Sequence, residues 1–158
     1  MNSLSTFLWF DGEAEEAMHY YLSIFKDAKP GEVTRYDEAT ASAINRPPGS
    51  VMTASFYING NEFVALNGGP LFKFNESVSF VINCNSQAEI DYYWDKLTAD
   101  GGEPNRCGWL KDKYGLSWQV VPAIMGKIRE QGDAAKTQRM MAAMLKMDKL
   151  DAKMLAEA

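Results

Sequence analysis

Two stretches decide the fold: "TFLWFDGEAEEAMHYYLSIF" at Thr6–Phe25 and "VSFVINCNSQAEIDYYWDKL" at Val78–Leu97. Each begins with an apolar run of strand length, passes through a polar break and ends in a run with helical periodicity. The dipeptides Tyr20-Tyr21 and Tyr92-Tyr93 coincide when the chain is shifted by 72 residues. The sequence therefore predicts that one structural unit is duplicated, and the assignment of single helices and strands depends on this repeat.

Both copies contain one helix after their first strand. Apolar residues at helical spacing predict the first helix at about Glu13–Phe25. The second helix is expected to begin after an N-cap at Ser86, with Glu89 completing a capping box, and to end near Thr98.

Strands joined by turn residues follow each helix. "VMTASFYINGNEFVALN" reads as two strands joined at Asn59-Gly60, a signal for a type I′ hairpin. "RCGWLKDKYGLSWQVV" reads as two strands joined around Lys113–Gly115, and the first copy carries a longer loop at Asp37–Ser50. The predicted order is β-α-β-β-β in each copy.

The end of the chain, "DAAKTQRMMAAMLKMDKLDAKMLAEA", is rich in strong helix formers. Met140, Met144, Met147 and Leu150 are spaced like one face of a helix, which predicts one helix, or two short ones, packed on the domain or on a partner subunit. We expect a single domain at 1–123, with one module at about 4–68 and another at about 76–122, followed by a helical tail at 124–158.

Composition limits the classes of partner. The chain has 158 residues, a net charge of -5 and 12% aromatic residues. Nucleic acids and anionic membranes need a basic face, so neither is expected as a partner. The start of the chain turns acidic at once and does not read as a signal peptide. Cys84 and Cys107 show no metal-binding spacing, so we expect reduced thiols and a cytoplasmic location.

Strand alternation assigns two faces to the predicted sheet. Leu8 and Phe10 in the first copy, and Val78, Phe80 and Ile82 in the second, are turned toward the helices. The opposite face is a mixture of aromatic, aliphatic, hydroxyl and amide side chains, which suits a ligand cleft. The predicted cleft residues are Phe7, Trp9, Val64, Ser79, Trp109 and Gln119. The alternative is that this face is ordinary core.

The duplicated βαβββ pattern resembles the vicinal oxygen chelate superfamily, which includes glyoxalase I, extradiol dioxygenases and bleomycin-resistance proteins. "FLWFDGEAEEAMHYYLSIF", "FVALNGGPLFKFNESVSFVINC" and "GWLKDKYGLSWQVVP" are similar to its PhnB-like branch, also labelled "3-demethylubiquinone-9 3-methyltransferase". The resemblance implies an α+β fold, the glyoxalase/bleomycin-resistance/dihydroxybiphenyl dioxygenase fold, in which two βαβββ modules form a curved mixed sheet followed here by C-terminal helices. It also implies a homodimer with cup-shaped clefts.

Metal enzymes of this superfamily take their ligands, His, Gln and Glu, from the first and last strands of the modules. The matching positions here are near Ser5 and Ser77, and at Val64 and Gln119. Two hydroxyls, an alkyl group and an amide make a poor donor set for a divalent ion, so we expect neither a metal nor another cofactor. A slip of register would bring in Glu62 as a donor.

Other reactive side chains give weaker signals, and the catalytic residues, if any, are unknown. Cys107 follows Arg106, and a neighbouring guanidinium is an environment that activates thiols, although a small buried strand residue is the simpler interpretation. His19 lies off the apolar stripe of its helix. The glycine pairs Gly68-Gly69 and Gly101-Gly102 do not form the strand-to-helix loop that a Rossmann-type methyltransferase requires.

We therefore expect a metal-free, dimeric protein that binds a small organic molecule. A second hypothesis is a metal-dependent lyase, isomerase or dioxygenase in which Gln119 and Glu62 hold the ion. A third is a non-catalytic dimeric interaction module that uses the methionine-rich tail as its contact surface.

Overall fold

The computed structural model describes residues 3–158, which form two compact units. The first unit ends at Lys73 and the second begins at Phe74. Each unit contains one β-α-β-β-β copy with a four-stranded sheet, so the predicted duplication and the α+β class are confirmed. The mixed sheet of the expected fold is present as two sheets, one in each unit.

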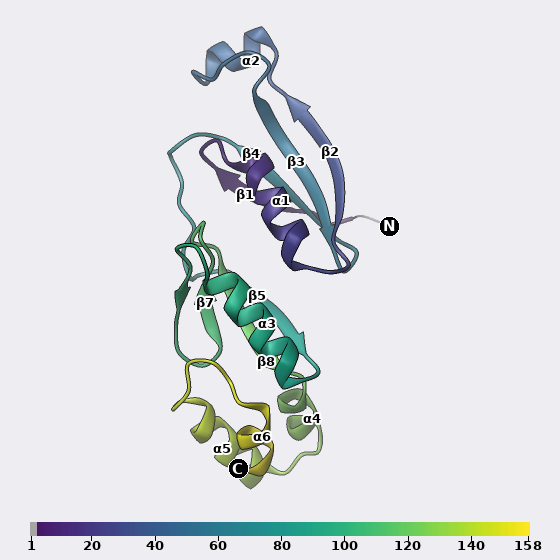
Figure 1. The fold of residues 1–158 in the computed structure, drawn as a ribbon, viewed down its shortest axis with the longest axis vertical. Helices are drawn as coiled ribbons and strands as arrows, with labels where there is room; N and C mark the ends of the chain where they lie inside the picture. Colours follow the sequence, from purple (N-terminus) through teal and green to yellow (C-terminus); the bar gives the residue numbers. More distant parts are fainter. Residues whose placement is uncertain (1–2) are drawn as a thin grey trace. The chain divides into compact units, whose positions relative to one another are not determined.

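The first unit has the strand order β1-β4-β3-β2. Its β1 and β4 are parallel, and the pairs β2–β3 and β3–β4 are antiparallel. The helix α1 connects β1 to β2, at the opposite edge of the sheet. Figure 1 shows α1 lying against one face of this sheet. The elements are β1 (Thr6–Phe10), α1 (Ala14–Ile24), β2 (Lys29–Arg35), α2 (Glu38–Ala43), β3 (Val51–Ile58) and β4 (Asn61–Asn67).

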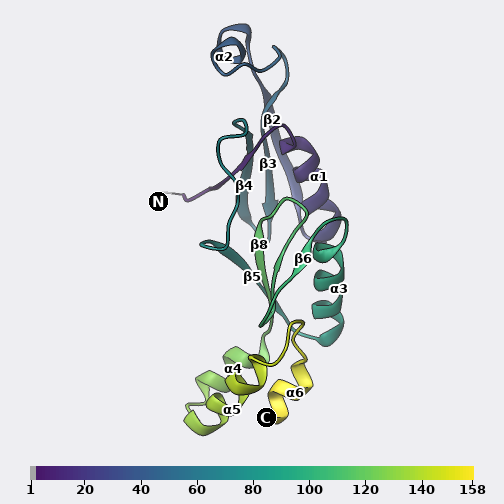
Figure 2. The same cartoon turned by 90° about the vertical axis from the view of Figure 1, so that its left-hand side faces the viewer.

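The second unit repeats this topology with the order β5-β8-β7-β6, in which β5 and β8 are parallel. Figure 2 shows α3 running along one side of its strands. The elements are β5 (Ser79–Cys84), α3 (Gln87–Thr98), β6 (Glu103–Pro104), β7 (Trp109–Lys111) and β8 (Ser117–Pro122).

Each unit buries the sheet face that its helix covers. In the first unit Tyr21 of α1 stacks on Phe56, which stacks in turn on Phe63, with ring centroids 5.5 and 5.4 Å apart. In the second unit the buried residues of α3 face a strand in which Trp118 and Val120 are also buried. These burials confirm most of the predicted faces. The prediction that Val78 faces the helix is wrong: this residue precedes β5 and is 62% exposed.

The structure confirms the predicted helix N-cap at Ser86 and the predicted hairpin turn at Asn59-Gly60. Ser86 Oγ accepts a hydrogen bond from Glu89 N at 3.2 Å, and Glu89 Oε2 accepts one from Asn85 N at 2.7 Å. The predicted N-cap is therefore confirmed, with the returning carboxylate bound one residue earlier than in a standard capping box. Asn59 and Gly60 have φ values of 48° and 76°, the two positive values that a type I′ turn requires.

The predicted alignment of the two copies is wrong in detail. The ladders pair Leu8 with Ala65 in the first sheet and Ile82 with Val120 in the second. Since Ala65 and Val120 occupy matching places relative to the hairpin turns, Leu8 corresponds to Ile82 and not to Phe80. The slip is two residues in the strand, so it leaves every side chain on the predicted face.

The long loop of the first copy is not wholly irregular. It contains the short helix α2, whose N-cap Asp37 accepts a hydrogen bond from Thr40 N at 2.8 Å. This bond lowers the pKa of the Asp37 carboxyl.

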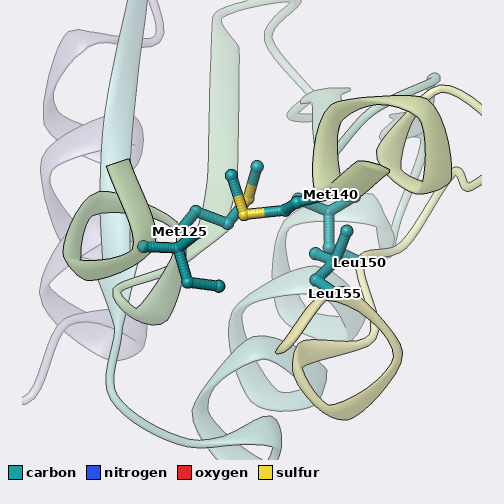
Figure 3. Close-up of a cluster of buried hydrophobic side chains, with 5 residues drawn as sticks. Met125, Met140, Leu150 and Leu155 are labelled. Carbon is teal, nitrogen blue, oxygen red and sulfur yellow. The ribbon is translucent and has the colours of Figure 1, made fainter. Parts of the chain in front are cut away.

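The C-terminal segment contains three helices and not the one or two that we expected: α4 (Ile124–Glu130), α5 (Ala134–Met144) and α6 (Ala152–Glu157). Because α5 ends at Met144, Met147 and Leu150 do not extend its apolar face. They still pack inward, since Leu150 is fully buried and Met147 is packed against the same cluster. Figure 3 shows Met125, Met140, Leu150 and Leu155 converging between the three helices.

The C-terminal segment is attached to the rest of the second unit by backbone hydrogen bonds. Cys107 N donates to Met147 O, and Gly108 N donates to Asp148 O, both at 2.8 Å. The Gln87 side chain donates to Leu150 O at 3.1 Å and accepts from Ala152 N at 2.9 Å. None of the helices in residues 3–158 combines the length and apolar character needed to cross a lipid bilayer.

Candidate functional site

The sheet face opposite α1, which we call the first open face, brings together three of the predicted site residues. Phe7 and Val64 are partners in the parallel β1–β4 ladder, and Trp9 lies two residues further along the same face. The Phe7 side chain is 62% exposed, whereas Trp9 and Val64 are half-buried. This face thus presents aromatic and aliphatic surface.

The Trp9 ring is held by the loop that follows β4. Its Nε1 donates a hydrogen bond to Gly69 O at 2.8 Å, and Phe72 meets the ring edge-on with centroids 4.9 Å apart. The ring also lies on Gly68, where an added Cβ would come within 2.3 Å of it. Trp9 therefore has one defined orientation, set by a loop whose glycines leave room for it.

Glu62 lies at the end of the first open face, where both its carboxylate oxygens have hydroxyl donors. The Ser5 hydroxyl donates to Oε2 and the Tyr57 hydroxyl donates to Oε1, the latter at 3.1 Å. The bond to this carboxylate raises the pKa of Tyr57. Glu62 is therefore engaged with its neighbours in the same sheet.

The face opposite α3, which we call the second open face, brings together the other three predicted residues. Gln119 is the ladder partner of Trp109 on one side and of Val81 on the other. Its Nε2 donates to Ser79 Oγ at 2.9 Å. Val81, 49% exposed, is a residue of this face that the sequence-based list of site residues did not include. Strand alternation does place Val81 on this face.

One polar atom on the second open face has no partner. Ser117, two residues before Gln119 on the same face of β8, is fully buried, and its Oγ makes no hydrogen bond within residues 3–158. A buried hydroxyl without a partner costs about 1–3 kcal/mol, so a water or a ligand group is expected there.

A buried carboxylate in the turn before β8 sets the position of that strand. Asp112 is 2% exposed, and its Oδ1 accepts from Tyr114 N at 2.9 Å and from Leu116 N at 3.1 Å. Its Oδ2 accepts from the indole Nε1 of Trp118 at 2.9 Å. An aspartate three residues before a glycine is typical of such a turn, so "DKYG" carried the signal. The turn fixes where β8 begins and hence where Gln119 lies.

The two cysteines are free and differ in exposure. Burial, with a smaller contribution from the Glu89 charge, raises the pKa of the Cys84 thiol to about 12. Cys107 is half-buried and adopts a left-handed backbone with φ of 60°. Its predicted reactivity stays a prediction. His19 is exposed on α1, as expected.

The donor set does not fit a divalent metal. Ser77 precedes β5, is exposed and bonds Asn75, so Ser79 is the hydroxyl that lies next to Gln119. Within residues 3–158 no three His, Cys, Asp or Glu side chains are grouped so that they could hold an ion. Serine hydroxyls, a valine and an amide supply neither the charge nor the imidazole nitrogen that such ions prefer.

Comparisons with known proteins identify the family and agree with the fold. A sequence model of the family described as 3-demethylubiquinone-9 3-methyltransferase matches residues 2–121. The PhnB protein from Bacillus cereus is 34% identical, with 77% of this chain and 100% of that chain covered and a TM-score of 0.67. No curated protein matches. The part of the chain beyond residue 121, which contains the helices α4 to α6, lies outside the family match.

Two more distant structures share the fold. Protein PA1353 from Pseudomonas aeruginosa has 16% identity, covers 77% of this chain and 98% of its own, and gives a TM-score of 0.59. A variant of the fosfomycin resistance protein FosX from Listeria monocytogenes, complexed with Mn(II) and 1S,2S-dihydroxypropylphosphonic acid, has 18% identity, with 77% and 92% covered and a TM-score of 0.51.

Proposed function

The chain belongs to the 3-demethylubiquinone-9 3-methyltransferase family, the PhnB-like branch of the vicinal oxygen chelate superfamily, and from this premise we propose that it is a metal-free, dimeric protein that binds a small organic molecule. The contact residues that we propose are those of the two open faces: Phe7, Trp9 and Val64 in the first unit, and Ser79, Trp109 and Gln119 in the second.

The observation that carries the proposal is the uncharged polar row on the second open face. The Gln119 amide donates one hydrogen bond to Ser79, and the buried Ser117 hydroxyl has no hydrogen-bond partner in the described chain. The Gln119 amide oxygen can accept a hydrogen bond, and the two serine hydroxyls can each donate and accept, so this row suits a neutral hydroxyl or carbonyl group on the ligand. Trp109, the ladder neighbour of Gln119, adds a ring on which a flat group can stack.

Metal-dependent lyase, isomerase or dioxygenase chemistry is the competing hypothesis. Its two proposed ligands were Gln119 and Glu62, and the Glu62 carboxylate is already engaged by Ser5 and Tyr57. A neutral amide alone gives a divalent ion little affinity. Metal analysis of protein purified without chelator or polyhistidine tag separates the two hypotheses, because a stoichiometric ion would favour the enzyme.

We also propose that the methyltransferase label does not describe the activity. Dinucleotide-type cofactor sites use a glycine-rich turn between a parallel strand and a helix. Here Gly68-Gly69 follows β4 and Gly101-Gly102 follows α3, and each sheet contains one parallel strand pair.

The dimer and the cytoplasmic location belong to the same proposal. Phe7 and Val81 leave apolar surface on the open faces, 62% and 49% exposed, which a second copy of the chain would cover. Two free cysteines suit a reducing compartment. Exposed Met141, Leu145 and Met154 on the C-terminal segment support the interaction-module alternative, in which the tail makes the contact.

The test uses phenol, catechol and indole as probes, with toluene as the compound that lacks a polar group and cyclohexanol as the compound that lacks an aromatic ring. Amide chemical shifts and thermal stability are followed in titrations of the full chain. We expect saturable binding of the aromatic hydroxyl compounds, weakened at least tenfold in Gln119→Ala, with a stability loss of about 1 kcal/mol for the bond to Ser79. Gln131→Ala, an exposed glutamine after α4, is the matched control.

Two outcomes contradict the proposal. The first is the absence of saturable shifts on either open face with any probe. The second is unchanged binding in Gln119→Ala, which would remove this amide from the site. Light scattering on the same samples gives the oligomeric state, and a monomer that binds the probes normally would refute the dimer while leaving the binding function in place.

A further inference from the structure

A cavity lies in the first unit, and none of the proposed contact residues of the first open face lines it. It has a volume of about 260 Å³ and is formed where the loop after α2 meets the start of α1 and the ends of β3 and β4. This volume is slightly below the range of about 300–1,000 Å³ that holds drug-sized ligands, so it suits a smaller molecule. The lining residues are Gly12, Glu15, Arg46, Pro47, Ser50, Val51 and Asn67.

Asn67 makes the wall of this cavity rigid. The side chain is buried, and its Oδ1 accepts from Gly12 N at 3.0 Å and from Ala14 N at 2.9 Å. Its Nδ2 donates to Val51 O at 3.0 Å, and its own carbonyl accepts from the Tyr36 hydroxyl at 2.6 Å. One amide thus ties together β3, β4 and the entry to α1, so the cavity exists before any ligand arrives.

The loop that closes the cavity is fixed as well. Ser50 N and Oγ both donate to Pro47 O, at 3.1 and 2.6 Å, and Tyr36 N donates to Ser50 O at 2.9 Å. Arg46 N donates to Ala41 O of α2 at 2.9 Å. The part of the chain that sequence analysis treated as a plain loop therefore holds Arg46 in a defined place.

The two charged side chains that line the cavity have opposite signs. Arg46 Nη2 pairs with Asp11 Oδ1 at 2.5 Å, and its side chain is only 20% exposed. This pair uses one of the five donors that a guanidinium offers, and a Cβ at Gly12 would lie 3.4 Å from Nη1. Glu15, in the first turn of α1, supplies the carboxylate.

We propose that this cavity binds a small zwitterion with the chemistry of a free α-amino acid. The ligand carboxylate accepts hydrogen bonds from Arg46, and the ligand ammonium group donates to Glu15. A simple anion would meet the Glu15 carboxylate, and a simple cation would leave the donors of Arg46 that Asp11 does not engage without a ligand partner, so a ligand with both charges suits both walls. The site is independent of the open faces, since none of the proposed contact residues of those faces lines it.

The experiment titrates each of the twenty amino acids into the full chain, up to about 10 mM, a concentration that detects dissociation constants in the millimolar range. Amide chemical shifts of Gly12, Glu15 and Ser50 report on the cavity. The strongest binder is then compared with the amine that lacks its carboxylate and the acid that lacks its ammonium group. We expect saturable shifts at these amides and at least tenfold weaker binding of both truncated compounds.

Matched variants assign the two charges. Glu15→Gln and Arg46→Gln should each weaken binding at least tenfold, whereas Glu16→Gln in the same turn and Arg139→Gln, an exposed arginine on α5, should leave it unchanged. Arg46→Gln also breaks the pair with Asp11, so the melting temperature of this variant is measured as well. If Arg46→Gln is unfolded, the binding result for Glu15→Gln decides the test. The proposal is overturned if no amino acid binds, if either truncated compound binds as tightly, or if Glu15→Gln binds as the parent does.

Discussion

Trp9 and Gly68 pack so closely that a methyl group at Gly68 would overlap the indole ring, 2.3 Å from its Cζ2. The glycine is needed here for space, since its φ lies outside the left-handed region. The contact orients the largest aromatic residue of the first open face. The loop after β4 is therefore part of the candidate site, because it orients Trp9.

Gly68→Ala should displace the Trp9 ring and break its hydrogen bond to Gly69 O. We expect the free energy of unfolding to fall by about 1–3 kcal/mol, as for other overpacked sites. The resonance of the Trp9 indole N–H should shift at the same time. Gly126→Ala is the control, because nothing lies within 4 Å of its Cβ and the residue is helical. That control should be neutral or stabilising by up to about 1 kcal/mol. A parent-like indole resonance in Gly68→Ala would disprove the close contact.

Asp112→Ala should destabilise the second unit more than a surface capping residue does. Three donors, Tyr114 N, Leu116 N and Trp118 Nε1, lose their acceptor in a place with little access to water. Leaving buried donors unsatisfied costs about 1–3 kcal/mol each, and the losses are not additive, so we expect a total of about 2–4 kcal/mol by chemical denaturation. Asp133→Ala, an exposed N-cap on α5, should cost about 1 kcal/mol.

Equal losses in the two aspartate variants would show that the Asp112 turn does not hold β8. Asp112→Asn refines the test because its amide oxygen can still accept the two backbone bonds while its NH₂ group faces the indole N–H of Trp118. This variant should lie between the parent and Asp112→Ala.

The sequence was sufficient for the topology because the signals for it are local. The Asn59-Gly60 turn and the Ser86 cap each depend on a few adjacent residues, and alternation along a strand assigned the side chains of β1, β4 and β8 to the correct faces. The register of the repeat depends on pairing between distant strands. A two-residue slip leaves the alternation unchanged, so the Tyr20-Tyr21 match could not reveal it.

In the candidate sites too, local patterns place some residues, whereas others are brought together only by the fold. Phe7, Val64 and Gln119 could be placed on open faces from periodicity alone. The cavity beside Arg46 could not be predicted, since it requires Asp11, Asn67 and Ser50, far apart in sequence, to be brought together by the fold. The spacing of Met147 and Leu150 also led to the wrong prediction that both residues continue a helix. Apolar residues in an irregular segment can fill the same core as those of a helix.

The attachment of Lys149 to α3 should depend on pH only at the extremes. Lys149 Nζ lies 3.0 Å from Asp91 Oδ1 and 3.6 Å from Asp95 Oδ1. The bond to Lys149 lowers the pKa of Asp91 from its ordinary 3.8, so this contribution to stability is present above that value and is lost as pH falls through the lowered pKa. The bond to Asp91 raises the pKa of Lys149 from its ordinary 10.5, so the contribution is lost as pH rises through the raised pKa.

Between those limits the amide resonance of Ala152, whose N–H is bonded to Gln87, should stay constant with pH. Lys149→Met should shift that resonance and flatten the acid and alkaline changes in stability. Lys153→Met, whose exposed side chain pairs weakly with Glu157 at 4.0 Å, is the control. A parent-like pH profile in Lys149→Met would mean that other groups govern the attachment.

Gly108→Ala should release the C-terminal segment from the second sheet. Gly108 has a φ of 82°, and a Cβ there would lie 2.8 Å from Val120 O and 2.9 Å from Leu150 Cδ1. The same residue bonds Asp148 O through its N–H and accepts from Val120 N through its carbonyl, so it joins the tail to the strand that carries Gln119. We expect loss of the hydrogen bonds to the tail and displacement of Trp109, the next residue and the ladder partner of Gln119.

Gly115→Ala separates the cost of backbone conformation from the cost of contact. Gly115 has a nearly equal φ of 85°, but nothing lies within 4 Å of its Cβ, so the substitution there should cost only the left-handed penalty of about 1–2 kcal/mol. Gly108→Ala should lose roughly 1–3 kcal/mol more, because Leu150 and the β8 backbone must also move. Binding of the aromatic probes should weaken in Gly108→Ala and not in Gly115→Ala. Equal losses of stability in the two variants, with probe binding intact in both, would mean that the C-terminal segment has no part in positioning Trp109 and Gln119.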